Sequence, residues 1–154
     1  KLEDEDALPT QLYLSTNAAD YQSFLKINRP RYDDSWERWN RTLKMLSTLG
    51  TRTVLRITLI RGYNDDEEMI PAFASLLQKS NVHFVEIKSY MHIGRSTNRL
   101  EYSDMLEMDE VRSFADKLVQ ENNAFTVMDE SEISKIVILQ NKKRFIDRFI
   151  PAYC

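Results

Sequence analysis

The strongest constraint on the fold of this chain is the run TVLRITLI (Thr53 to Ile60), in which apolar and β-branched residues dominate. Such a run is typical of a parallel strand that is buried on both faces. Two further β-favouring runs follow the same rule, QLYLST at 11–16 and VHFVEIK at 82–88. The sequence therefore predicts three strands that can pair in one sheet.

Segments with helical periodicity separate these strands. A short helix is expected at 20–27, and Pro30 would stop it. In the next helix Asp34 and Glu37 have capping-box spacing, and Gly50 is placed to end it. The apolar stripe of that helix consists of Trp36, Trp39, Leu43, Leu46 and Leu49. Helices are also predicted around 69–77, with Pro71 in the first turn, and at 109–121.

The order of elements predicts the fold class. Two more strands, at 124–128 and 133–139, follow the last helix, so the order is β-α-β-α-β-loop-α-β-β. This alternation indicates an α/β fold with parallel strands and helices packed outside them. A complete TIM barrel needs about 250 residues, and this chain has 154, so we expect half of a barrel with an unpaired sheet edge. The expected division is a leader or linker at 1–10, the half-barrel at 11–141, and a basic and apolar tail at 142–154 that forms a docking helix.

Composition excludes several classes of function. The net charge of −3 is not that of a free-standing nucleic-acid binder, so any RNA contact must come from a local patch. One cysteine, Cys154, excludes an intrachain disulfide and an all-cysteine metal site, and we expect no metal site in this chain and a reducing, cytoplasmic compartment. No apolar run approaches the roughly 18 residues of a membrane span. The chain begins at Lys1 and not at methionine, which we interpret as a fragment of a longer protein.

Polar and basic residues follow each of the three predicted strands. In parallel α/β sheets, sites form beyond the carboxyl ends of the strands. The residues at these ends include Ser15, Asn17, Lys26 and Arg29, then Arg61, Tyr63 and Asn64, then Lys88, Tyr90, His92, Arg95, Asn98 and Arg99. Because a local cationic surface binds phosphate whatever the net charge of the protein, this rim is the best candidate for a site.

Two features of the rim have alternative interpretations. The segment KSYMHIGRSTNR (Lys88 to Arg99) suits a single-stranded RNA loop through phosphate contacts and stacking on Tyr90. Composition alone favours a solvated polar loop, because exposed basic loops are common. Lys88 ends an apolar strand, where a buried lysine with a lowered pKa can act as a Schiff-base nucleophile. The simpler alternative is a lysine that extends its amine to solvent.

Three segments together resemble one family. They are QLYLSTNA with KINRP (11–30), TVLRITLIRGYN (53–64) and FVEIKSYMHIGRSTNRL (84–100), and the later ESEISKIVIL (130–139) agrees with them. The third segment is similar to the wyosine-base-formation segment of the 4-demethylwyosine synthases, in particular the archaeal ones. The resemblance covers residues 10 to about 140 in the expected order.

The resemblance implies a fold and a reaction. The family consists of radical S-adenosylmethionine enzymes of the lyase type with a partial TIM-like barrel, so this chain would be its C-terminal half. They condense N1-methylguanosine at position 37 of tRNA(Phe) with carbons of pyruvate, which gives 4-demethylwyosine in wybutosine biosynthesis. Their cofactors are S-adenosylmethionine and [4Fe-4S] clusters, of which one is held by a CxxxCxxC loop.

The resemblance also implies roles for the rim residues. Ser15, Asn17, Thr58 and Asn64 would bind the S-adenosylmethionine. The tRNA or the substrate pocket would be contacted by Lys26, Arg29, Arg61, Tyr90, His92, Arg95, Asn98 and Arg99, with Lys88 as the candidate catalytic residue. No CxxxCxxC occurs here, and a cluster needs thiolate ligands. The chain alone should therefore be inactive and should depend on an N-terminal half-barrel. The alternative is a non-catalytic tRNA-binding or interaction module of α/β fold.

Overall fold

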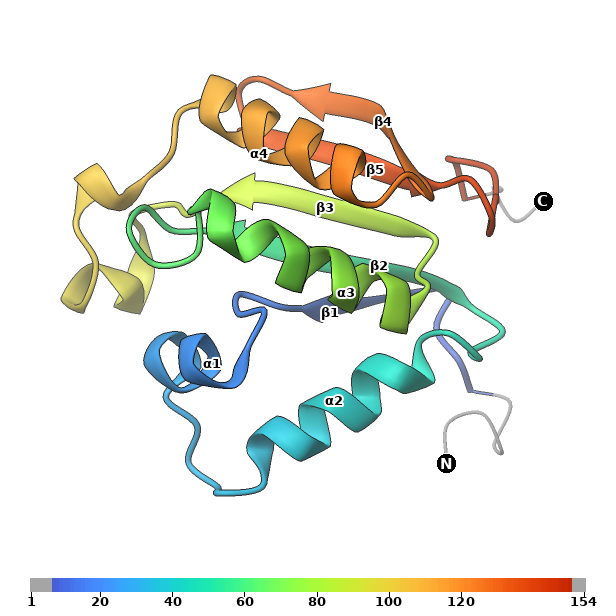
Figure 1. Ribbon diagram of the computed structural model, residues 1–154, viewed down its shortest axis with the longest axis horizontal. Coiled ribbons are helices and arrows are strands. Elements are labelled where there is room, and N and C mark those ends of the chain that lie inside the picture. The colour runs from blue at the N-terminus through green and yellow to red at the C-terminus, as the bar shows by residue number, and fades with distance from the viewer. Residues whose placement is uncertain (1–6, 151–154) are drawn as a thin grey trace.

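A single five-stranded sheet organises the protein. The computed structural model describes residues 7–150, and the strand order is β1-β2-β3-β5-β4 (Figure 1). The strands are β1 (Gln11–Ser15), β2 (Arg52–Leu59), β3 (Phe84–Ser89), β4 (Phe125–Ser131) and β5 (Ile136–Asn141). β1, β2 and β3 are parallel, as predicted, whereas β5 is antiparallel to both β3 and β4.

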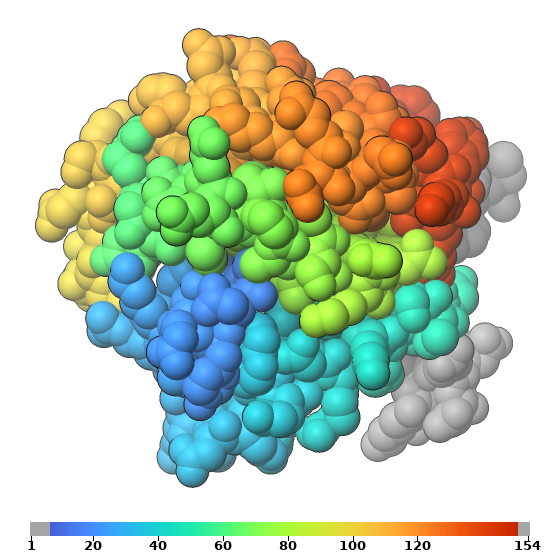
Figure 2. All heavy atoms as spheres, in the orientation of Figure 1, coloured from blue at the N-terminus to red at the C-terminus, as the bar shows by residue number. Residues whose placement is uncertain are grey.

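Three helices cover one face of this sheet. The α-helices are α1 (Tyr21–Asn28), α2 (Ser35–Met45), α3 (Ile70–Ser80) and α4 (Met108–Glu121), and short 3₁₀ turns lie at η1 (Glu67–Met69), η2 (Gly94–Asn98) and η3 (Tyr102–Asp104). α2, α3 and α4 lie against the sheet in Figure 1, and their atoms make up much of the face seen in Figure 2. The continuous core between them and the sheet includes Leu43, Leu55, Phe73, Ile87 and Phe114. α1 belongs to a second, smaller core with Ile60, Tyr90 and Leu100. No helix in the described residues is long and apolar enough to cross a membrane.

The opposite face of the sheet presents polar side chains. Strand pairing places Ser15 beside Arg56, Arg56 beside Glu86, and Thr58 beside Lys88. Arg56 Nε lies 2.7 Å from Glu86 Oε1, and the guanidinium carbon lies 4.5 Å from the centroid of the Tyr13 ring. This face therefore has charged and aromatic groups where the other face has a hydrocarbon core.

The prediction of a wholly parallel sheet was wrong at its C-terminal end. Only residues 132–135 separate β4 from β5. Parallel neighbours need a crossover of a dozen or more residues, so such a short connection permits only a hairpin. The described residues form an open sheet, and β1 and β4 each pair with one strand.

The expected start of α2 at Asp34 is confirmed, because Asp34 is its N-cap residue, but the expected capping box and the expected end were wrong. Asp34 makes no side-chain capping bond, because its carboxylate accepts from Arg38 Nε at 2.7 Å. The helix ends at Met45 and not near Gly50, since the Ser47 and Thr48 hydroxyls bond to carbonyls of the last turn. The apolar stripe is confirmed in its C-terminal part: Leu43, Leu46 and Leu49 are buried.

The tail after β5 is not the expected docking helix. Residues 142–150 form turns and bends, and 151–154 lie outside the described residues, as do 1–6 of the expected leader. The Arg52 guanidinium donates to the backbone carbonyls of Asp147, Arg148 and Phe149. Because these carbonyls accept from Arg52, they are not available for the hydrogen bonds of a helix. The same contacts attach the tail to β2.

Candidate functional site

The loops after the three parallel strands meet at one cavity. Its volume is about 210 Å³, and it is lined by Asn17, Ile27, Thr58, Ile60, Tyr63, Tyr90, Ser96, Arg99 and Leu100. Four of these, Asn17, Thr58, Tyr90 and Arg99, are residues that the sequence places in the site. Tyr63 belongs to the predicted rim but had no assigned role. The other four were not predicted, although Ser96 lies in the segment 88–99 that indicated the rim. Ile27 and Leu100 have no sequence signal beyond hydrophobicity.

Asn64 holds the floor of the cavity together. Its side chain is fully buried, its Oδ1 accepts from the Ile60 N–H at 2.7 Å, and its Nδ2 donates to the carbonyls of Asn17 and Thr58 at 2.8 and 2.9 Å. Asn17 Oδ1 in turn accepts from the Thr58 N–H at 3.3 Å. Asn64 therefore fixes the end of β2 to the end of β1, and its amide is fully used inside the protein.

Cationic residues lie on the segments that border the cavity. Lys26 Nζ lies 4.6 Å from the centroid of the Tyr63 ring, and Arg99 Nη2 donates to the Ile27 carbonyl at 3.2 Å. Arg95 is exposed on η2. Arg29 is exposed at the end of α1, where it adopts the left-handed conformation with a φ of 47°. Four of the predicted tRNA-binding residues therefore belong to the segments that border the cavity.

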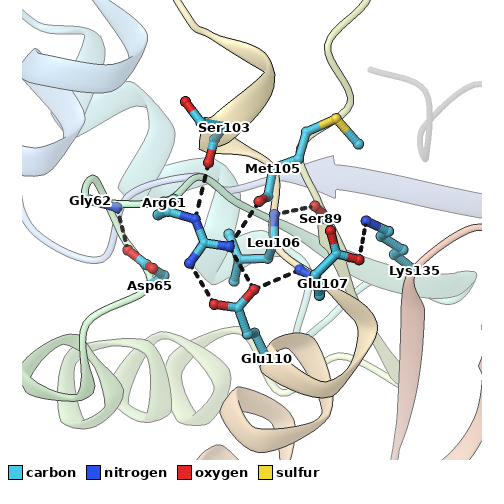
Figure 3. A network of polar contacts seen from close by, with 10 residues as sticks. All are labelled: Arg61, Gly62, Asp65, Ser89, Ser103, Met105, Leu106, Glu107, Glu110 and Lys135. Carbon is cyan, nitrogen blue, oxygen red and sulfur yellow. Dashed lines mark hydrogen bonds and ion pairs between the residues drawn. The ribbon is translucent and has the colours of Figure 1, made fainter.

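Arg61 lies at the same end of the sheet but is bound within the protein (Figure 3). Its guanidinium donates to the Ser103 and Met105 carbonyls, both at 3.0 Å, and to both carboxylate oxygens of Glu110 at 2.5 and 2.6 Å. The hydrogen bonds from Arg61 hold the pKa of Glu110 below its usual value, although burial opposes this. Arg61 therefore joins the loop after β2 to the loop after β3 and to the start of α4.

The loop after β3 is attached at its far end as well. Ser89 Oγ accepts from the Leu106 N–H at 2.8 Å, and Lys135 Nζ lies 2.8 Å from Glu107 Oε2 (Figure 3). Between these points η2 and η3 give the loop regular turns. Tyr90 is buried in the wall of the cavity, whereas Arg95, Asn98 and Arg99 are exposed, so both interpretations of the segment 88–99 stay open.

Lys88, Ser15, Asn98 and the half-buried His92 are also outside the cavity lining. Lys88 is half-buried on the polar face of β3, in register with Thr58 and Ile136. Ser15 is exposed at the end of β1, and Asn98 is exposed on η2. No cluster of three or more histidine, cysteine or acidic residues in the described part of the chain could hold a metal ion.

Comparisons with known proteins agree on one family. Residues 79–141 match the family model described as wyosine base formation. The chain is 44% identical over 139 residues to the S-adenosyl-L-methionine-dependent tRNA 4-demethylwyosine synthase of Methanocaldococcus jannaschii, covering 90% of this chain and 43% of that protein. It is 40% identical over 135 residues to the protein of the same name from Pyrococcus abyssi, covering 88% and 39%.

Solved structures give the same answer for the fold. A structure described as TYW1 with a lysine–pyruvate adduct bound matches with a TM-score of 0.80 and 40% identity, over 93% of this chain and 44% of that one. A crystal structure of archaeal TYW1 matches with a TM-score of 0.72 and 37% identity, over 94% and 45%. The chain spans less than half the length of these relatives. By sequence and by fold, the chain is similar to the C-terminal part of the tRNA 4-demethylwyosine synthases, and its residues 79–141 match the model of wyosine base formation.

Proposed function

We propose that this chain is the C-terminal part of an S-adenosylmethionine-dependent enzyme that makes 4-demethylwyosine in tRNA. The substrates would be N1-methylguanosine at position 37 of tRNA(Phe) and pyruvate. The observation that supports this most directly is the cavity where the loops of β1, β2 and β3 meet, which Arg99 lines. Lys26 lies over the Tyr63 ring in that lining, and Arg29 and Arg95 are exposed on the same segments. The reaction class is that of the similar tRNA 4-demethylwyosine synthases.

The cavity has the chemistry to hold part of S-adenosylmethionine. Asn17, Thr58 and Ser96 offer an amide and two hydroxyls, and Tyr63 and Tyr90 offer aromatic rings. These groups suit a ribose and a purine, respectively. At about 210 Å³ the cavity is smaller than the roughly 300–1,000 Å³ of complete ligand sites, so it would take one portion of the cofactor. When bound, S-adenosylmethionine supplies the radical that starts the reaction.

An iron–sulfur cluster does not fit this chain. Such a cluster needs several thiolates, whereas the sequence has one cysteine, Cys154, which lies outside the described residues. We propose that a preceding N-terminal half supplies the cluster. It would pair with the outer edge of β1 and cover the polar face of Tyr13, Arg56 and Glu86, which would close a partial TIM-like barrel.

Contact with tRNA is tested by reversing charges on the rim. The Arg95→Glu/Arg99→Glu variant should bind tRNA at least tenfold more weakly and should reduce the slope of log K against log salt by roughly 1.4, because each single-strand phosphate contact contributes about 0.7. The matched control reverses Lys79 and Lys142, which are exposed at the opposite end of the sheet. An unchanged slope in the rim variant, or an equal loss in the control, would contradict the proposed tRNA face.

Lys88 stays a prediction for pyruvate chemistry. Its position on the polar face beside Thr58 would place its amine inside a closed barrel. Reduction with borohydride in the presence of pyruvate, followed by peptide mass mapping, shows whether Lys88 forms a Schiff base with pyruvate. A pyruvate-derived mass on Lys88 supports the role, and trapping that persists in Lys88→Met assigns it to another lysine.

A further inference from the structure

A chain of hydrogen bonds runs through the loop after β3 and ends at a histidine. Ser96 Oγ donates to the Ile93 carbonyl at 2.6 Å, and Tyr90 Oη donates to Ser96 Oγ at 3.2 Å. The Tyr90 hydroxyl also lies 3.1 Å from Nδ1 of His92. Tyr90 and Ser96 line the cavity, so the chain follows its wall.

The direction of each hydrogen bond follows from the acceptor at the end of the chain, the Ile93 carbonyl. A backbone carbonyl can only accept, so it takes the single hydroxyl proton of Ser96. Ser96 must then accept from Tyr90, which uses the single phenolic proton. The bond between Tyr90 and His92 is therefore donated by the imidazole, and the proton of neutral His92 is on Nδ1.

This assignment leaves Nε2 of His92 as a bare nitrogen with a lone pair. Within residues 7–150, no buried side-chain nitrogen or oxygen lacks a hydrogen-bond partner, and no bond from Nε2 is found, so this atom is reachable from solvent. The ring is further held by Tyr102, at 6.3 Å between centroids with an interplanar angle of 77°. The Nδ1–H bond persists in both the neutral and the protonated imidazole, so Nε2 can gain and lose a proton without disturbing the chain.

We infer that Nε2 of His92 accepts the proton of the exocyclic amine of the target guanine, an assignment that rests on the proposed function. Guanine methylated at N1 has one donor group left on its Watson–Crick edge, the exocyclic NH2. A bare, fixed acceptor nitrogen at the rim matches that donor. An imidazole in the other tautomer would present a second N–H to it.

The proton transfer is coupled to closure of the third ring. The exocyclic nitrogen adds to the carbonyl carbon of the pyruvate-derived unit, which forms the C–N bond, and the carbonyl π pair moves to oxygen. The N–H proton passes to Nε2 and then to that oxygen, so His92 is restored and the product of the step is a neutral carbinolamine. Tyr90 and Ser96 act as positioning residues, because they fix the tautomer without touching the guanine.

The tautomer is measured without any assay of activity. The chain has two histidines, and the Thr53 N–H donates to Nδ1 of His83 at 3.1 Å, so the two rings should be in opposite tautomers. Two-bond ¹⁵N–¹H correlation spectra at pH 8 should show the proton on Nδ1 in His92 and on Nε2 in His83, with His92→Asn used for assignment. The Nε2–H form as the main species of His92 would overturn the inference.

The catalytic role is tested in the complete synthase that contains this chain. His92→Asn keeps an N–H donor for Tyr90 and removes Nε2, so kcat should fall about 100-fold or more, the range of a general base, with tRNA affinity within twofold. Tyr90→Phe keeps Nε2 but frees the tautomer, so its kcat should fall less and its His92 spectrum should show both forms. An unchanged kcat in His92→Asn refutes the inference, whereas a wild-type synthase that makes no 4-demethylwyosine refutes the proposed function.

Discussion

Replacing Asn64 distinguishes a structural asparagine from a ligand-binding one. Its amide makes three hydrogen bonds, to Ile60 N–H and to the carbonyls of Asn17 and Thr58, and its side chain is fully buried. A neutral intramolecular hydrogen bond contributes about 1 kcal/mol. Asn64→Ala should therefore lower the free energy of unfolding by about 3 kcal/mol. At about 2–4 °C per kcal/mol for a domain of this size, the Tm should fall by about 6–12 °C.

The assay is urea denaturation of the chain followed by circular dichroism. Asn64→Asp should be at least as destabilising, because a carboxylate oxygen would replace the amide donor opposite two carbonyls. Asn98→Ala, at an exposed position of η2, is the control and should stay within about 0.5 kcal/mol of the parent. If Asn64→Ala is as stable as that control, the amide does not hold the rim together and is free to bind a ligand.

Three further substitutions test other parts of the structure. In the folded state the pKa of Glu110 is lowered by Arg61, so the pair stabilises the fold above the ordinary value of 4.5 and less so as the pH falls below it. In Glu110→Gln the free energy of unfolding should therefore depend less on pH in the acid range. The same pH dependence in the variant and the parent would contradict the pairing. Burial, together with Arg144 and Arg52, lowers the pKa of His83 from 6.5 to about 4, so stability should decrease between pH 6.5 and 4 as the unfolded state takes up the proton. His83→Asn retains an acceptor for Thr53 and should remove that decrease in urea titrations at pH 7.5 and 4.5; an equal decrease in both proteins would refute the assignment. Arg144 donates to the carbonyls of Leu46, Leu49 and Asn81, and Arg144→Met should cost about 2 kcal/mol and raise amide exchange across residues 142–150, which a protected tail in the variant would disprove.

The periodicity of the sequence predicts the elements better than it predicts their ends. The buried strand at 53–60 and the helix that begins near Pro71 are found almost where expected, as β2 and α3. Apolar patterns report which face is buried, so they are reliable for whole elements. Capping depends on single side chains with several possible partners, and Asp34 bonds to Arg38 where a backbone N–H was expected.

The position of the rim was predictable from the sequence. Which of its residues line the cavity and which are used inside the protein was not. Strand order alone brings the segments after β1, β2 and β3 to one edge, and the cavity lies there. Asn17 and Asn64 have the same side chain and similar positions after a strand. Only the three-dimensional structure shows Asn17 lining the cavity and Asn64 buried beneath it.

The sequence also does not show which basic residues of the rim are free to contact RNA. Arg61, Arg95 and Arg99 all follow parallel strands, yet the Arg61 guanidinium bonds to two backbone carbonyls and Glu110. Those carbonyls belong to residues 103 and 105, more than 40 positions away along the chain, so no local sequence pattern predicts these hydrogen bonds. A count of cations therefore overestimates the surface that RNA can contact. The exposed Arg95, which is outside the lining, is the most direct site for charge reversal, while substitution of Arg61 or of Arg99 would also change the wall of the cavity.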